Sequence, residues 1–366
     1  MNFKNTSLLL FFVLCTFSCS QNKKNTIIKG NINNLPDGTI YLYKDTPENR
    51  IDSGNVENGI FNLVHVWEKD AEPFYLGIDH VDKKGVTRAF NFPTNSKYKG
   101  SGWNSPSFFS DSIILINGKI TDFKIKDIKL PETFRFVTSP KINAGKQTKA
   151  LYNIDNDLFE NINNTTIQTV KNKLKQYPYS YHLLYKIYEN KNSFSSQQIF
   201  EFLKLFKGEI TQSDTYKKVY TYNEKRFNEK KNSLPLLEDN NGVKKDILNK
   251  NYKKHLVIFW ASWCGPCRQE IPLLKKIYQN HNKEIEFVSI SVDNDKKSWQ
   301  KALLQENIGW KQLIANEENP DYEKLQILFK LNKAIPYTVL VDNDMKILAT
   351  FTGLSDEKEL EKLINQ

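Results

Sequence analysis

Short runs of β-branched and aromatic residues alternate with turn-forming residues over about 26–140. The runs include "TIIKGNI", "TIYLYK" and "IFNLVHVW", and they are separated by Pro36-Asp37-Gly38 and Asn58-Gly59. An Asn-Gly pair favours a two-residue hairpin because both turn positions require a positive φ. A second such pair, Asn117-Gly118, occurs within "IILINGKITDF". The pattern predicts an antiparallel β-rich domain over residues 26–140.

Between about residues 150 and 230 the apolar positions change to a helical period. Over 199–206, apolar residues fall at i, i+3, i+4 and i+7, as in an amphipathic helix. Ser195 with Gln198 matches a capping box at its start. The aromatic run "YPYSYHLLYKIY" is more typical of a buried core than of a ligand platform. We predict a helical segment over 150–230, with the charged stretch 223–233 as a helix end or linker.

Strands and helices then alternate regularly over residues 234–366. "HLVIFW" (255–260) and "IEFVSISV" (285–292) have the composition of buried strands, and a helical pattern over 264–280 separates them. Helices are predicted near 296–307 and 321–330, then a hairpin of "YTVLVD" and "KILATF", and a last helix from Asp356. Parallel strands joined by a crossover helix, followed by an antiparallel hairpin, indicate an α/β domain. The predicted fold class is therefore multidomain α+β.

Residues 1–18 have the layout of a secretory signal. Lys4 supplies a positive charge, and the apolar run from Leu8 to Phe17 is too short for a bilayer, which needs about twenty residues. The end of this segment resembles a bacterial lipoprotein signal. The resemblance implies cleavage before Cys19 and lipidation of that thiol, with residues 19–25 as a polar tether. Ordinary cleavage near the same place is the alternative.

Charge and cysteine content narrow the function. The chain of 366 residues carries 52 Lys plus Arg and 42 Asp plus Glu, a net charge of +10. The excess is spread along the chain, which favours a solvated cationic surface over a nucleic-acid interface. Cys15 would leave with the signal and Cys19 would carry lipid. The mature chain would then retain two thiols, Cys264 and Cys267.

The pair lies where a predicted strand ends and a predicted helix begins. Cys264 would therefore lie near unpaired N–H groups and the positive end of the helix dipole, which stabilise a thiolate. Cys267, one turn later, would be shielded and placed to resolve a mixed disulfide. Gly265 and Pro266 suit a tight turn and a first helical turn.

Three other uses of the pair fit less well. A zinc site needs four ligands, whereas His255 falls in the strand pattern and His281 at the far end of the helix, so no metal is expected. A disulfide across two residues restrains little chain. A peroxidase would carry its peroxidatic cysteine in a different sequence context. Redox exchange is the prediction.

The segment "FWASWCGPCRQEIP" resembles the active site of TlpA-like, membrane-tethered thiol-disulfide oxidoreductases of the thioredoxin superfamily, and the resemblance extends over residues 234–366. It implies a thioredoxin fold, a helix-kinking Pro272 and a cis-proline at Pro336. It also implies that Glu270 relays the proton of Cys267; a solvent-facing Glu270 is the alternative. The implied substrate-contacting residues are Trp263, Gly265, Pro266, Ile335 and Pro336. Two departures are Ile258, where cytoplasmic thioredoxins carry a buried Asp, and Tyr337, where a Thr is common.

The sequence thus predicts a lipid-anchored cell-envelope protein, facing the periplasm or outer surface, that reduces disulfides of client proteins without a cofactor. The Gly-Pro dipeptide resembles that of reducing members, which implies a membrane electron donor, with cytochrome c maturation as a candidate pathway. An oxidase or isomerase with the same site is one alternative. Another is an envelope binding module with an auxiliary redox domain, because the N-terminal portion is similar to β-rich domains of unknown function in lipid-anchored proteins.

Overall fold

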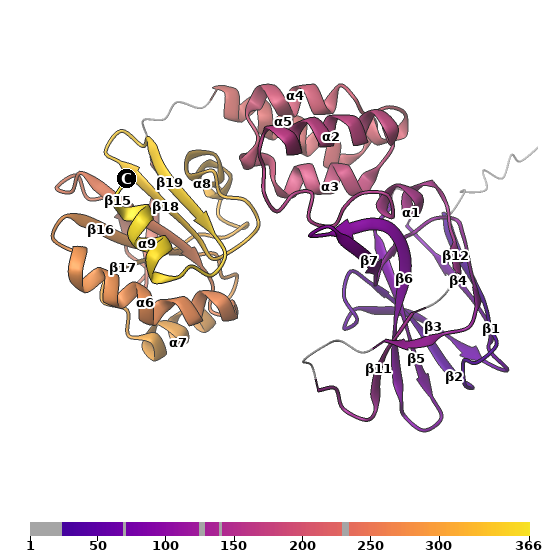
Figure 1. The fold of residues 1–366 in the computed structure, drawn as a ribbon. Coiled ribbons are helices and arrows are strands. Elements are labelled where there is room, and N and C mark those ends of the chain that lie inside the picture. Colours follow the sequence, from indigo (N-terminus) through magenta and orange to yellow (C-terminus); the bar gives the residue numbers. More distant parts are fainter. Residues whose placement is uncertain (1–23, 69–70, 124–128, 139–140, 229–233) are drawn as a thin grey trace, which may run out of the picture. The chain divides into compact units, whose positions relative to one another are not determined.

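The computed structural model describes residues 24–68, 71–123, 129–138, 141–228 and 234–366 (Figure 1). The predicted signal, Cys19 and most of the predicted tether lie outside these residues. The chain divides into two compact units at Asn153 and Ile154. No helix within the described ranges is long and apolar enough to cross a membrane.

The first unit is rich in β-strands, as the strand-and-turn pattern predicts, and these strands form two sheets rather than one. The smaller sheet has the order β12-β9-β1-β4, formed by Lys141–Asn143, Ile113–Gly118, Asn25–Ile32 and Ile60–Val66. The larger has the order β10-β11-β6-β5-β2-β3, formed by Thr121–Phe123, Phe134–Thr138, Thr87–Tyr98, Tyr75–Asp82, Gly38–Lys44 and Arg50–Val56. β7 (Ser101–Ser105) pairs with β6, and β8 (Phe108–Phe109) pairs with β5. Most pairings are antiparallel, but β1 with β9 and β6 with β11 are parallel.

The two Asn-Gly pairs behave differently. Asn58 and Gly59 have φ values of 53° and 76°, and Glu57 and Ile60 exchange backbone hydrogen bonds across them, so this turn is confirmed. Asn117-Gly118 forms no hairpin, and that prediction is wrong. These residues end β9, which pairs with β1 and β12 on its two edges, whereas β10 joins the other sheet. Burial of Ile114 and Ile116 in the core keeps β9 in the smaller sheet.

Helices follow the strands. α1 (Lys146–Leu151) belongs to the first unit, and the second unit begins with α2 (Asn164–Gln176), α3 (Tyr181–Glu189), η1 (Lys191–Ser193), α4 (Ser196–Leu203), η2 (Glu209–Gln212) and α5 (Asp214–Asn228). The capping box of Ser195 and Gln198 is present at the start of α4. Within the aromatic run, the buried residues Tyr177, Tyr181, Leu183, Leu184 and Ile187 belong to the core as predicted, whereas Tyr188 is 37% exposed. Residues 229–233 of the predicted linker lie outside the described residues.

The C-terminal sheet confirms the predicted α/β domain. Its order is β14-β13-β17-β16-β15-β18-β19, formed by Lys244–Asp246, Leu236–Asp239, Lys311–Ile314, Ile285–Ser291, Lys254–Trp260, Tyr337–Asp342 and Ile347–Thr352. β15 is parallel to β16, and β18 and β19 form the antiparallel hairpin. The helices are α6 (Gly265–His281), α7 (Lys296–Glu306), α8 (Tyr322–Phe329) and α9 (Glu357–Ile364). α6 and α9 pack on one face of β15 through Leu256 and Ile258, and α8 packs on the other through Val257 and Phe259.

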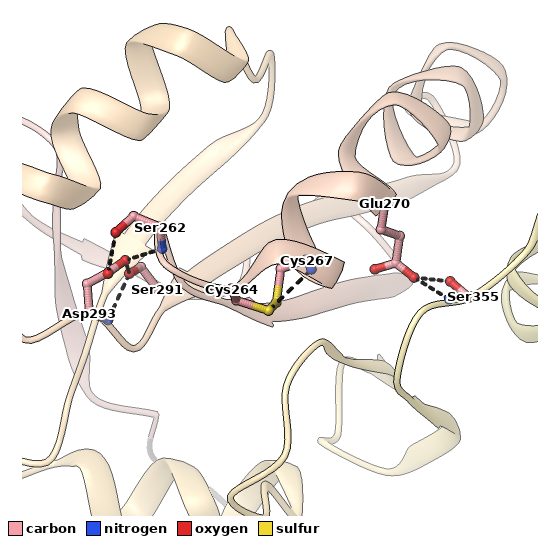
Figure 2. The surroundings of a disulfide bond; sticks show 7 residues. All are labelled: Ser262, Cys264, Cys267, Glu270, Ser291, Asp293 and Ser355. Atoms are coloured by element: carbon pink, nitrogen blue, oxygen red, sulfur yellow. Dashed lines mark hydrogen bonds between the residues drawn. A yellow bond between two sulfur atoms is a disulfide. The ribbon is translucent and has the colours of Figure 1, made fainter. Parts of the chain in front are cut away.

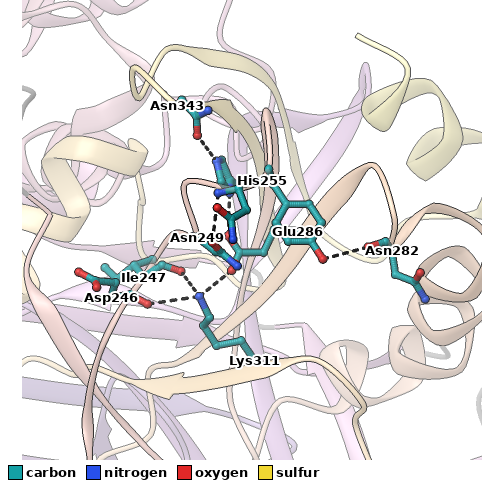
Figure 3. Close-up of polar contacts among 10 residues, drawn as sticks. Asp246, Ile247, Asn249, His255, Asn282, Glu286, Lys311 and Asn343 are labelled. Atoms are coloured by element: carbon teal, nitrogen blue, oxygen red, sulfur yellow. Dashed lines mark hydrogen bonds and ion pairs between the residues drawn. The ribbon is translucent and has the colours of Figure 1, made fainter.

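A buried polar network ties the strands together at the amino end of β15 (Figure 3). His255 is fully buried; its Nδ1 lies 2.7 Å from Glu286 Oε2 and its Nε2 lies 2.8 Å from Asn343 Oδ1. Burial opposes ionisation of Glu286, but hydrogen bonds from His255, Asn249 and Lys311 outweigh it and lower its pKa. Because both ring nitrogens have partners here and Cys264 follows the opposite end of β15, His255 is part of the scaffold.

Candidate redox site

The cysteine pair lies at the junction of β15 and α6. β15 ends at Trp260, the backbone N–H of Cys264 donates to the carbonyl of Ala261 at 3.1 Å, and α6 starts at Gly265 with Cys264 as its N-cap residue. Pro266 lies in the first turn, where no intrahelical N–H is needed. Pro272 lies inside the helix, at the position where the resemblance implies a kink.

Cys264 and Cys267 are joined by a disulfide in this structure (Figure 2). Cys264 Sγ accepts a hydrogen bond from the backbone N–H of Cys267 at 3.2 Å. The two residues are 5% and 2% exposed. The sulfur of Cys264 therefore occupies the N-terminus of α6, where backbone N–H groups and the helix dipole favour negative charge.

The segment just before β18 packs against the buried residues around the disulfide. The Ile335–Pro336 peptide bond is cis, and Pro336 is buried. Ile335 packs against the buried cluster that contains Trp260, Cys264 and Cys267. Trp263, beside the first cysteine, is 70% exposed. The structure thus places Ile335 against the disulfide cluster and leaves an exposed indole next to Cys264.

Glu270 is a buried carboxyl group on α6, three residues after Cys267. It is 2% exposed, which excludes the solvent-facing alternative. Burial raises its pKa, against the opposing effect of hydrogen bonds from Ser355. Positions i and i+3 lie on one face of a helix, so Glu270 and Cys267 are neighbours on α6.

The two departures from the thioredoxin pattern are both core residues. Ile258 packs with Leu256 and Leu274. Tyr337 is 6% exposed, and its hydroxyl donates to the carbonyl of Phe329 at 2.8 Å. Its side chain is therefore held inside the domain by a contact that a Thr could not make.

Sequence reasoning missed one buried acid near the site. Asp293 follows β16, is 1% exposed and accepts hydrogen bonds from Ser262, which lies two residues before Cys264. The sequence did offer one signal for Asp293. It follows the predicted strand 285–292, which was expected to run parallel to the strand before the cysteines, so both strands would end at the same edge of the sheet.

Comparisons with known proteins agree with this fold. Residues 251–347 match the family model described as "Thioredoxin-like". Over 128 residues the chain is 26% identical to the thioredoxin-like protein YneN of Bacillus subtilis, covering 34% of this chain and 71% of YneN. Over 132 residues it is 22% identical to the thiol-disulfide oxidoreductase ResA of Bacillus subtilis, covering 36% of this chain and 70% of ResA.

A solved structure of a putative thiol-disulfide oxidoreductase from Bacteroides vulgatus is 30% identical, covering 37% of this chain and 88% of that chain, with a TM-score of 0.32. The curated relatives and the family model show that the C-terminal domain is thioredoxin-like and related to thiol-disulfide oxidoreductases of the ResA type. The Cys264–Cys267 pair lies in this thioredoxin-like domain, whose relatives include thiol-disulfide oxidoreductases.

Proposed function

We propose that this protein reduces disulfides of client proteins outside the cytoplasm, with Cys264 as the attacking thiolate and Cys267 as the resolving thiol. The observation that supports exchange through Cys264 is the position of its Sγ at the N-terminus of α6, hydrogen-bonded to the N–H of Cys267. A sulfur held there is favoured as a thiolate, which is the nucleophile in disulfide exchange. The reducing direction is proposed from the Gly265-Pro266 dipeptide, which resembles that of reducing members.

The exchange proceeds in two displacements from the dithiol form. The Cys264 thiolate attacks one sulfur of the client disulfide, forming a mixed disulfide and releasing the other client sulfur as a thiolate. Cys267 then loses its proton and attacks Cys264 Sγ, which forms the Cys264–Cys267 disulfide and frees the second client thiol. The client gains two electrons, and its two thiols take up the proton lost by Cys267 and one proton from water, while this protein becomes the oxidised form that the structure shows.

Two further groups assist these steps. Glu270 is buried and lies on the same helix face as Cys267, so it is placed to receive the Cys267 proton. Exposed Trp263 and partly buried Ile335, which packs against the cysteine cluster, would form an apolar surface for the client chain, with Pro336 next to Ile335 in the chain.

The proposed electron donor, lipid anchor and pathway follow from the proposal that this protein is a reductase. A reductase in an oxidising compartment must be reduced again, so a membrane electron donor is required after each turnover. Lipidation at Cys19 would hold the protein beside such a donor. Cytochrome c maturation is a candidate pathway for the clients.

Trapping a mixed disulfide tests the proposal. In the full chain, Cys267→Ser removes the resolving thiol, so client proteins should accumulate as covalent adducts through Cys264, visible on non-reducing gels and released by dithiothreitol. Cys264→Ser is the matched control and should trap none. Failure of Cys267→Ser to trap any partner in cells would contradict exchange with proteins.

A further inference from the structure

Two serines and an aspartate connect the redox loop to the neighbouring strand. β15 and β16 are parallel, with Trp260 opposite Ser291 at their carboxyl ends. The N–H of Val292 donates to the carbonyl of Trp260 at 2.9 Å. Ser262 and Asp293 follow these two strand ends, so the topology brings them together although they lie 31 positions apart in the sequence.

The Asp293 carboxylate accepts three hydrogen bonds, drawn in Figure 2. Oδ2 accepts from the backbone N–H of Ser262 at 2.8 Å and from the hydroxyl of Ser291 at 2.6 Å, and Oδ1 accepts from the hydroxyl of Ser262 at 2.6 Å. The backbone of Asp293 is held as well, because its N–H donates to Ser291 Oγ at 3.0 Å and its carbonyl accepts from Asn316 at 2.9 Å. A carboxylate that is 1% exposed and has this many donors is confined to one position.

This anchor acts on the short turn that leads into α6. Ser262 directly precedes Trp263 and Cys264, and the turn is closed by the hydrogen bond from the Cys264 N–H to Ala261. Trp263 is 70% exposed, so side-chain packing contributes little to its orientation. The direction in which the chain enters α6 therefore depends on the bonds that hold Ser262.

We propose that Asp293 is a positioning residue for the redox site. By holding Ser262 at both its N–H and its hydroxyl, it fixes Cys264 at the helix N-terminus and presents Trp263 outward. The part of this proposal that concerns Trp263 rests on the proposed function, in which Trp263 contacts the client protein. The position of Cys264 can be tested without any client.

Three variants of the full chain test it. Asp293→Asn keeps the side-chain shape but replaces one acceptor oxygen by an NH₂ group, which cannot accept these bonds. Ser262→Ala removes one anchoring bond and leaves the charge of Asp293 in place. Asp295→Asn is the matched control, because Asp295 is an exposed N-cap of α7 and Asn caps a helix equally well.

Each variant is first shown to be folded by its thermal midpoint. In the reduced proteins we expect Asp293→Asn and Ser262→Ala to lower the rate of Cys264 alkylation by iodoacetamide about tenfold, because the thiolate loses its stabilised position. The equilibrium with glutathione should move about tenfold towards the protein disulfide, which is about 30 mV more negative for this two-electron couple. Asp295→Asn should match the unmodified chain.

Either of two results would overturn the proposal. One is a folded Asp293→Asn and a folded Ser262→Ala that both react within about twofold of the control. The other is faster alkylation of Asp293→Asn with Ser262→Ala unchanged, which would show that the charge of Asp293 matters and its bonds do not. If the unmodified chain failed to reduce glutathione disulfide, the proposed function would fail while the alkylation rates would still report on the position of Cys264.

Discussion

Glu270 on α6 accepts hydrogen bonds from both the backbone N–H and the hydroxyl of Ser355, a residue 85 positions later in the chain. The N–H bond is 2.9 Å long. These bonds satisfy Oε1, whereas Oε2 is buried without a hydrogen-bond partner in the described part of the chain. Burial penalises the charged form, so the pKa of this carboxyl group is raised above its usual value, against the opposing effect of the Ser355 bonds.

Glu270→Gln should separate catalysis from stability. Gln keeps an acceptor for Ser355 but cannot take the Cys267 proton, so resolution of the mixed disulfide should slow by about a hundredfold. The raised pKa means that the folded state binds this proton more tightly than the unfolded state. Folding stability therefore falls as pH rises through the range between the unfolded and the folded pKa.

The Gln variant lacks that loss and should be more stable than the unmodified chain at pH 8. Stopped-flow kinetics measure the rate at which the mixed disulfide is resolved. Thermal midpoints at pH 4 and pH 8 measure the predicted change in stability. An unchanged resolution rate would remove Glu270 from the proton-transfer step.

The helical segment is hydrogen-bonded to the chain just before the cis-proline. Asn192 Nδ2 donates to the carbonyl of Leu331 at 2.8 Å, the N–H of Asn192 donates to Asn332 Oδ1 at 3.0 Å, and Asn332 donates to Ser193 Oγ at 2.8 Å. Asn192 is 5% exposed and also accepts from the hydroxyl of Tyr222 at 2.9 Å. Helical residues thus hold the segment that leads to Ile335 and Pro336.

Asn192→Ala should therefore affect both stability and client binding. The substitution removes the two bonds that the Asn192 side chain makes with the Leu331 carbonyl and the Tyr222 hydroxyl and keeps its backbone bond to Asn332. These buried groups then lose a partner, and we expect a decrease in the free energy of unfolding of about 1–3 kcal/mol. Loosening the segment beside Pro336 should raise KM for a protein client more than it lowers kcat. The control is Asn365→Ala, which removes an exposed side-chain hydrogen bond to the carbonyl of Glu361. It should change neither the free energy of unfolding nor the kinetics. Equal kinetics for both variants would contradict this role of the helical segment.

His182 on α3 predicts sensitivity to acid. It is 6% exposed, and burial, with a smaller effect of Lys186, lowers its pKa to about 3. Between that value and its unfolded value of 6.5, the unfolded state binds the proton that the folded state excludes. This contribution to stability is complete above pH 6.5 and is lost as the pH falls, by up to about 1.4 kcal/mol per pH unit.

Urea unfolding at pH 7, 6, 5 and 4 measures this slope. His182→Leu should flatten it, whereas His281→Leu, at the partly exposed end of α6, serves as the control. Equal slopes for the two variants would contradict the assignment to His182.

Local sequence signals were enough to predict the strands and the helix that form the redox site. The short strands and the contacts of the buried acids depend on residues far apart in the sequence, so they could not be predicted from local patterns. β15 and β16 are continuous apolar runs, and α6 has a clear helical period. Gly265 and Pro266, between the cysteines, mark the turn and the start of the helix. β13, β14 and β17 have only three or four residues each and were missed, since so short a run carries little periodicity. The roles of Glu270 and Asp293 depend on Ser355 and Ser262, which only the folded chain brings to them.

The direction of electron flow is the central claim, and the reduction potential of the Cys264/Cys267 pair tests it most directly. It is measured on a soluble form beginning after Cys19, equilibrated against dithiothreitol and glutathione buffers. A reductase of thioredoxin type should show a potential of about −270 mV. A value of about −120 mV would make the protein a disulfide donor and would contradict the proposed reduction of client proteins.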